Sequence, residues 1–167
     1  MEKLIISHRL KEIAKHLNKG VFFADIGSDH AYLPSFVCLN DPLATCIAGE
    51  VNEGPFNQAK EVVAKYHLED RIDVRLGDGL AVLKDSTPEA IVIAGMGGKL
   101  IESILLSDLN KTKNINQLIL QPNIDAHRLR QWFLNHNYQL EDELVIEENN
   151  HYYEILIAKK TSKVELY

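Results

Sequence analysis

The sequence contains few of the residues that mark several common protein classes. It has two cysteines in 167 residues, and no Cys/His spacing resembles a zinc site. No stretch approaches the ~20 consecutive apolar residues that a bilayer-crossing helix requires. The first residues lack the long apolar run of a secretory signal peptide. We therefore expect a cytoplasmic domain with no metal centre and no membrane partner, and we favour a monomer.

The two cysteines, Cys38 and Cys46, fall in a predicted helix and a predicted strand with apolar neighbours. We expect buried thiols rather than a disulfide, and this expectation fits a reducing cytoplasm.

Positive charge is also scarce, because 18 Lys and Arg stand against 24 Asp and Glu, for a net charge of −6. This balance argues against nucleic-acid binding over the whole surface. Residues 1–19 are the exception: five basic and two acidic side chains give +3, which leaves −9 for the rest. This segment is either a solvated amphipathic helix or a local phosphate-contacting patch.

Helical and strand patterns alternate along a chain that is long enough for one domain with a hydrophobic core. Helices are expected at 5–18, 32–40, 52–66, 100–106 and 125–135, and strands at 21–25, 44–50, 71–76, 90–94, 118–121, 138–148 and 152–160. Ser7 is a candidate N-cap for the first helix. Only Asn149-Asn150-His151 separates the last two strands, which predicts an antiparallel hairpin. The alternation predicts an α/β fold with a mostly parallel sheet.

Unusual residues follow four of the predicted strands. The first strand ends at Asp25 and runs into Gly27, Ser28 and Asp29. The next two end in Gly49-Glu50 and Gly77-Asp78-Gly79, and the fourth ends in Gly95-Met96-Gly97-Gly98. Ligands of open α/β sheets bind at the carboxyl ends of the strands, so these segments predict a binding site.

The residue types indicate specific contacts. Glu50 follows Gly27 by 23 residues, the spacing at which an acid reaches a ribose diol. Gly27 lets a ligand approach the backbone closely. Asp25 either fixes the turn or receives an ammonium group, and Asp78 either accepts from an adenine amine or stabilises its own turn. The expected cofactor-binding residues are Asp25, Gly27, Ser28, Glu50, Val51, Gly77, Asp78, Gly79, Gly95 and Met96.

A dinucleotide is the competing ligand, and the first loop disfavours it. The dinucleotide fingerprint is G-x-G-x-x-G, and only Gly27 is present here. Asp29 would face a pyrophosphate where neutral backbone amides are needed. An acidic loop instead suits a cationic cofactor such as S-adenosylmethionine, which carries a sulfonium and an ammonium group. The closing hairpin favours the same choice.

Several segments together resemble the bacterial tRNA (adenine-N1)-methyltransferases that modify adenosine 22. These segments, which span about residues 5–160 in the family's order, are 24–34, 47–50, 54–56, 77–80, 93–98 and 120–123. The resemblance implies a class I, Rossmann-like methyltransferase: a doubly wound seven-stranded sheet of order 3-2-1-4-5-7-6 with a C-terminal antiparallel hairpin. It also implies S-adenosylmethionine as donor and tRNA as acceptor. The catalytic domain would be 1–160, and 161–167 would begin a further helical region that the family usually carries.

The chemistry needs little from the protein beyond alignment, because neutral adenine N1 already has a lone pair. Asp29 is the candidate to stabilise the positive charge that develops on the base. His30 and Tyr32 either shape the pocket, stack on the base or pack structurally. Asn123 either binds a base edge or caps the following helix. The fourth strand end lacks the Asp/Asn-Pro-Pro-aromatic segment of N6 methyltransferases, which disfavours methylation of the exocyclic amine.

Three readings of function stay open from the sequence. The favoured one is the tRNA methyltransferase, with Arg128, Arg130 and the N-terminal lysines as candidate phosphate contacts. A methyltransferase acting on another RNA or a small molecule is the second. A non-catalytic module that binds S-adenosylmethionine is the third.

Overall fold

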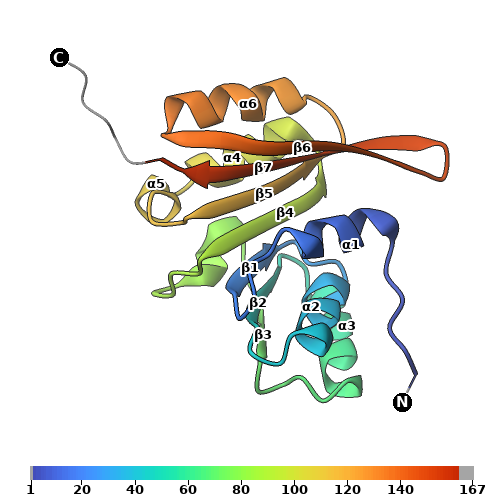
Figure 1. The fold of residues 1–167 in the computed structure, drawn as a ribbon. Helices are drawn as coiled ribbons and strands as arrows, with labels where there is room; N and C mark the ends of the chain where they lie inside the picture. The colour runs from blue at the N-terminus through green and yellow to red at the C-terminus, as the bar shows by residue number, and fades with distance from the viewer. Residues whose placement is uncertain (1, 162–167) are drawn as a thin grey trace.

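Seven strands form one sheet in the order β3-β2-β1-β4-β5-β7-β6, as predicted (Figure 1). The structure is a computed structural model, and it describes residues 2–161. The elements are α1 (His8–Lys15), β1 (Phe22–Ile26), α2 (Tyr32–Asn40), β2 (Thr45–Glu50), α3 (Glu53–Lys65), β3 (Ile72–Leu76), the 3₁₀-helix η1 (Gly79–Leu83), β4 (Ala90–Met96), α4 (Gly98–Leu106), α5 (Leu109–Thr112), β5 (Gln117–Pro122), α6 (Ala126–Asn135), β6 (Tyr138–Glu148) and β7 (His151–Lys160).

Strands β1 to β5 are parallel and bring their carboxyl ends to one edge of the sheet. Asp25, near the end of β1, is in register with Ala48 of β2 and Val92 of β4. The strand order reverses between β1 and β4, and open α/β sheets bind ligands outside the strand ends at that point.

The sheet is buried on both faces because its strands alternate between two apolar clusters. Phe23 and Val92 pack with residues of α1, α2 and α3, whereas Ala24, Ile91 and Ile93 pack with residues of α4 and α6. Figure 1 shows the two groups of helices on opposite sides of the sheet. Nearly continuous apolar strands are what such two-sided coverage requires.

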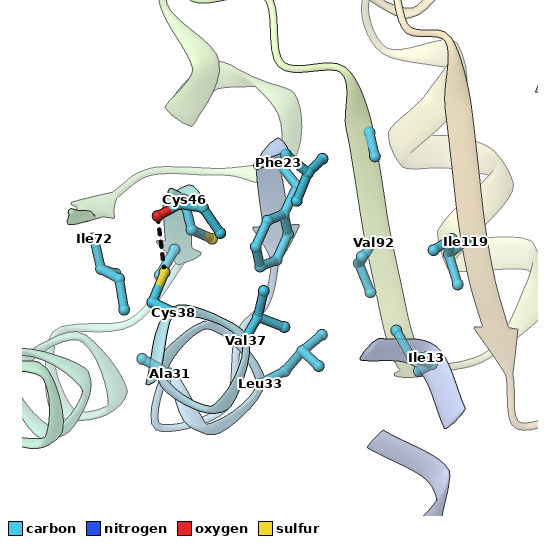
Figure 2. Packing of buried hydrophobic residues seen from close by; sticks show 14 of the residues in the cluster. Ile13, Phe23, Ala31, Leu33, Val37, Cys38, Cys46, Ile72, Val92 and Ile119 are labelled. Carbon is cyan, nitrogen blue, oxygen red and sulfur yellow. Dashed lines mark hydrogen bonds between the residues drawn. The ribbon is translucent and has the colours of Figure 1, made fainter. Parts of the chain in front are cut away.

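Cys38 and Cys46 are free, buried thiols, which confirms the sequence-based expectation. Cys38 of α2 and Cys46 of β2 belong to the same apolar cluster as Phe23 and Val92. The Cys38 thiol donates to the carbonyl oxygen of Ala44 at 3.4 Å (Figure 2). Burial raises the pKa of Cys38 to about 11 and raises that of Cys46 well above its usual range.

The chain ends in a hairpin whose two strands are joined by a tight turn. Glu148 pairs with His151, so the turn has two residues, Asn149 and Asn150, and β7 begins one residue earlier than predicted. Both asparagines have positive φ, 53° and 64°, as a type I′ turn requires. Strand β7 pairs with β5 over Gln117–Leu120, and the rest of the hairpin extends past β5 (Figure 1).

The first helix is shorter than the predicted 5–18. The Ser7 hydroxyl accepts from the Leu10 amide at 3.3 Å, so Ser7 is the N-cap and α1 begins at His8. Two short elements, η1 and α5, were not predicted at all. Of the predicted tail 161–167, the described part is Thr161, whose amide donates to the carbonyl oxygen of Asn137 at 2.8 Å. The other tail residues, and any helical region after them, lie outside the described residues.

Between residues 2 and 161, no helix has both the length and the apolar character needed to span a membrane. The same residues contain no group of three or more His, Cys, Asp or Glu side chains placed to hold a metal ion.

Candidate functional site

A cavity of about 330 Å³ lies at the carboxyl ends of β1, β4 and β5. Its walls are Arg9, Leu10, Asp25, Gly27, Ser28, Asp29, Ala94, Gly95, Met96, Asn123 and Tyr153. Seven of these were predicted from the sequence as site residues: Asp25, Gly27, Ser28, Asp29, Gly95, Met96 and Asn123. The cavity therefore joins the loops after three strands that are neighbours in the sheet.

Asp25 is the buried acid of the cavity, with 4% of its surface exposed. The pKa of its carboxyl is raised to about 8, mainly by burial and also by the negative charges of Glu50 and Asp29, while the charge of Arg9 opposes the rise. Among residues 2–161, neither Asp25 nor Glu50 forms an ion pair with a basic side chain. Buried acids are normally paired, so this wall favours a ligand that brings positive charge.

Gly27 is required by both its conformation and its surroundings. Its φ is +73°, and a Cβ at this position would lie 2.5 Å from the methyl carbon of Met96. The amides of Gly27 and Ser28 both donate to the Gly49 carbonyl oxygen, at 2.9 and 3.0 Å. The loop after β1 is thus held against β2 while its backbone stays open to the cavity.

Glu50 is positioned at the end of β2 by its neighbours on both sides. The Ser28 hydroxyl donates to Oε2 of Glu50 at 2.6 Å, and the Gly77 amide donates to the Glu50 carbonyl oxygen at 2.8 Å. Oε1 of Glu50 accepts no hydrogen bond from residues 2–161, although the residue is 6% exposed. One carboxylate oxygen is therefore oriented by Ser28, and the other has no partner within the described chain.

Five of the predicted cofactor residues do not line the cavity: Glu50, Val51, Gly77, Asp78 and Gly79. Val51 follows β2 and is exposed, and Asp78 stands exposed before η1, which begins at Gly79. Gly77 makes room for η1, because a Cβ on it would lie 3.0 Å from a methyl group of Val82.

The turn between β1 and α2 is unusual, because Asp29, His30 and Ala31 all have positive φ, from 48° to 69°. A left-handed conformation costs a residue with a side chain roughly 1–2 kcal/mol, and such costs concentrate at functional sites. The Asp29 side chain is 87% exposed and its carboxylate lies 3.2 Å from Nδ1 of His30. His30 stacks on Tyr32 with ring centroids 5.2 Å apart, and both rings lie outside the cavity lining.

A buried amide organises the other side of the cavity. Gln121 is fully buried at the end of β5, and its Oε1 accepts from Nη1 of Arg9 at 2.7 Å and from the Gly95 amide at 3.0 Å. Its Nε2 donates to Oδ1 of Asn123 at 3.2 Å. The Asn123 side chain is therefore oriented by Gln121, and Asp125 occupies the N-cap position of α6 in its place.

Sequence reasoning did not select Arg9, Gln121 or Tyr153 as site residues. The guanidinium carbon of Arg9 lies 5.3 Å from the centroid of the Tyr153 ring, and both residues line the cavity. The one available signal was Gln121 itself, a polar residue that ends an otherwise apolar strand.

Two of the predicted phosphate contacts are already neutralised. Arg128 pairs with Glu102 at 3.2 Å, and Arg130 pairs with Glu143 and with Glu154. These arginines are therefore weaker candidates for binding phosphate than the sequence suggested.

The reversed strand order, the antiparallel closing hairpin and the acids that end β1 and β2 together define a Rossmann-like methyltransferase domain. A sequence model of the tRNA (adenine(22)-N(1))-methyltransferase family matches residues 23–167. The chain belongs to this family, as the resemblance of its motifs had implied.

The individual relatives agree with this assignment. A tRNA (adenine(22)-N(1))-methyltransferase of Bacillus subtilis is 46% identical over 159 residues, which are 95% of this chain and 67% of that protein. The crystal structure of the B. subtilis m1A22 tRNA methyltransferase has a TM-score of 0.90 at 47% identity, covering 95% of this chain and 68% of that one.

A putative tRNA (m1A22) methyltransferase of Streptococcus pneumoniae, solved in complex with S-adenosyl-L-methionine, has a TM-score of 0.89 at 40% identity. The match covers 96% of this chain and 76% of that one. This chain spans about two thirds of the length of the curated relatives that it matches.

Proposed function

We propose that this chain binds S-adenosylmethionine and transfers its methyl group to N1 of adenosine 22 in tRNA. One observation carries the proposal: in this member of the family, two buried acids without basic partners, Asp25 and Glu50, lie at the carboxyl end of the sheet, and Asp25 borders the switch point between β1 and β4. Such acids suit a cationic nucleoside and disfavour a dinucleotide, whose pyrophosphate they would repel.

The described residues fit this cofactor. Asp25 offers a carboxylate to its ammonium group, and Gly27 leaves space that a side chain would fill. The partner-free oxygen of Glu50 can accept from a ribose hydroxyl, and Ser28 fixes the orientation of that carboxylate. Val51, Gly77, Asp78 and Gly79 extend the site toward the purine, and Gly95 and Met96 border the reacting end. When bound, S-adenosylmethionine supplies an electrophilic methyl group on a cationic sulfur.

We assign binding of the target adenine to residues at and beside the mouth of the cavity. N1 lies on the pairing edge of adenine, so the base must enter unpaired or flipped out. Asp29, exposed at the cavity, is placed to stabilise the positive charge that the base gains. The stacked His30 and Tyr32 offer a flat surface beside it, and Asn123 offers an oriented amide to a base edge.

The proposal extends to the setting of the enzyme. Residues 1–160 form the catalytic domain, and residues 161–167 begin a further region. The relatives are longer than this chain, and about a third of their length lies outside the match. The enzyme acts as a monomer in the cytoplasm, where its tRNA substrate is found, and needs no metal ion.

Transfer of a labelled methyl group tests the proposal directly. The chain is incubated with labelled S-adenosylmethionine and an unmodified tRNA transcript, and the product is mapped by primer extension, which N1 methylation arrests. We expect label in the tRNA and arrest at position 22, and neither in a transcript with guanosine at that position. Cofactor binding without transfer would reduce the chain to a binding module, and arrest elsewhere would show another RNA target.

A further inference from the structure

Gln121 is a buried polar side chain whose orientation is set by its partners. It lies near the end of β5, with none of its surface exposed. Its Oε1 accepts from the Gly95 amide at 3.0 Å and from Nη1 of Arg9 at 2.7 Å. A backbone amide and a guanidinium can only donate, so a flipped side chain would set its NH₂ group against two donors. The amide of Gln121 is therefore held in one orientation.

An irregularity in the neighbouring strand explains the first of these contacts. The register of β4 on β5 shifts between Ala94 and Met96, and Gly95 between them has a φ of +78°. The amide of Gly95 donates to the Gln121 side chain at this point. Bulges of this kind are over-represented next to active sites, where they change the direction of a side chain. Gln121 thus ties the irregular end of β4 to the end of β5.

The orientation of Gln121 in turn fixes that of Asn123. Nε2 of Gln121 is a donor, and Oδ1 of Asn123 accepts from it at 3.2 Å. The Asn123 backbone is held as well, because its amide donates to the Met96 carbonyl oxygen at 2.8 Å. Asn123 is exposed and lines the cavity, and its NH₂ group makes no hydrogen bond within residues 2–161. The side chain therefore offers a donor, and not an acceptor, to a bound molecule.

A donor at this position selects particular atoms of an adenine. The exocyclic 6-amino group is itself a donor, whereas the ring nitrogens N3 and N7 are acceptors. N1 must face the methyl group that it attacks, which leaves N3 and N7 for a protein donor. An acceptor would instead hold the 6-amino group, which is the group that methylation at N6 would need.

We propose that Gln121 is a positioning residue, which turns the NH₂ group of Asn123 toward the target adenine so that it donates to N3 or N7. This assignment deepens the proposed function and rests on it, because it specifies how the base to be methylated is held. The contact orients the ring with N1 toward the cofactor, and it gives the 6-amino group no acceptor from this side.

Atom-substituted tRNAs test the contact. Transcripts with adenosine, 3-deazaadenosine or 7-deazaadenosine at position 22 are assembled by ligation, and single-turnover methyl transfer is measured at saturating S-adenosylmethionine. Each deaza base replaces one ring nitrogen by C–H, and it also changes the reactivity of N1. The change in reactivity is common to all enzyme variants, so it cancels when the rate penalty of a deaza base is compared between variants.

For one of the two deaza bases, the penalty should be about 3- to 10-fold larger in the wild type than in Asn123→Ala, as for one neutral hydrogen bond. Gln121→Glu keeps the shape of the side chain, and a carboxylate beside Arg9 stays ionised and offers Asn123 no donor. Asn123 should then turn its oxygen toward the base, and the excess penalty should disappear. Asn123→Asp, which leaves Gln121 in place, should lose it as well.

Asn110→Ala removes an exposed asparagine of α5 outside the cavity, and this matched control should keep the wild-type penalty. Equal penalties in the wild type and Asn123→Ala, for both deaza bases, would overturn the contact. An excess penalty that persists in Gln121→Glu would overturn the positioning role of Gln121. A wild type that methylates none of the three transcripts, adenosine included, would refute the proposed function, and this assignment with it.

Discussion

Asp25→Asn should make the ligand-free protein more stable, and the gain should grow with pH. The carboxyl has a pKa of about 8 in the folded protein against an ordinary value of 3.8 for an exposed aspartate, mainly because burial penalises its charged form. Between these values the folded protein holds a proton that the unfolded chain has lost, so this group's contribution to stability falls as pH rises. At pH 7, roughly 3 units above the unfolded pKa, the carboxyl lowers the free energy of unfolding by about 4 kcal/mol, since each pH unit contributes about 1.36 kcal/mol.

Asparagine has nearly the same shape and no proton to lose, so the substitution removes this cost. Urea unfolding of the wild type and Asp25→Asn at pH 5 and pH 7 measures this effect. Groups that titrate alike in the two proteins drop out when their free energies of unfolding are subtracted. We expect a gain of about 4 kcal/mol at pH 7 and less than half of that at pH 5. Asp70→Asn is the control, because Asp70 is exposed and is not among the charges that act on the Asp25 carboxyl. A gain that does not change with pH, or a loss of stability, would refute the reasoning.

Three further predictions concern neighbouring positions. Gly27→Ala should destabilise the fold by at least ~1–2 kcal/mol, the cost of an alanine in the left-handed conformation. The second substitution Met96→Ala should remove the 2.5 Å clash but not this backbone strain, so the melting temperature of the double variant should recover only in part. Glu50→Gln should weaken S-adenosylmethionine binding about tenfold with little change in melting temperature, and calorimetry that finds equal affinity would remove the ribose contact. Cys38 and Cys46 should react slowly with a thiol reagent in the native protein and rapidly in urea, and fast native labelling would contradict their burial.

The strands and the hairpin were predictable because the sequence expresses them locally, whereas the strand order was predicted from the resemblance to the family. Strands such as β1 and β4 are short apolar runs, and the pair Asn149-Asn150 tolerates the positive φ of a tight turn. The 3₁₀-helix η1 and the four-residue α5 were missed, because elements of one turn carry no hydrophobic period.

The acidic half of the site was also predictable, because Asp25, Gly27 and Glu50 each end or follow a buried strand. Tyr153 was missed because nothing near it in the chain marks it, and Arg9 was noted only as one charge of the basic segment 1–19. Their positions in the cavity come from tertiary contacts, such as the hydrogen bond that joins Arg9 to Gln121 over 112 residues of sequence.

That long-range bond has a consequence for the order in which the protein is built. During synthesis α1 leaves the ribosome before Gln121 and Tyr153, which follow it by more than a hundred residues. Closing so large a loop is slow compared with forming local structure. Helix α1 is therefore made well before it can reach its final place, and the pocket is completed only when the closing hairpin has been translated.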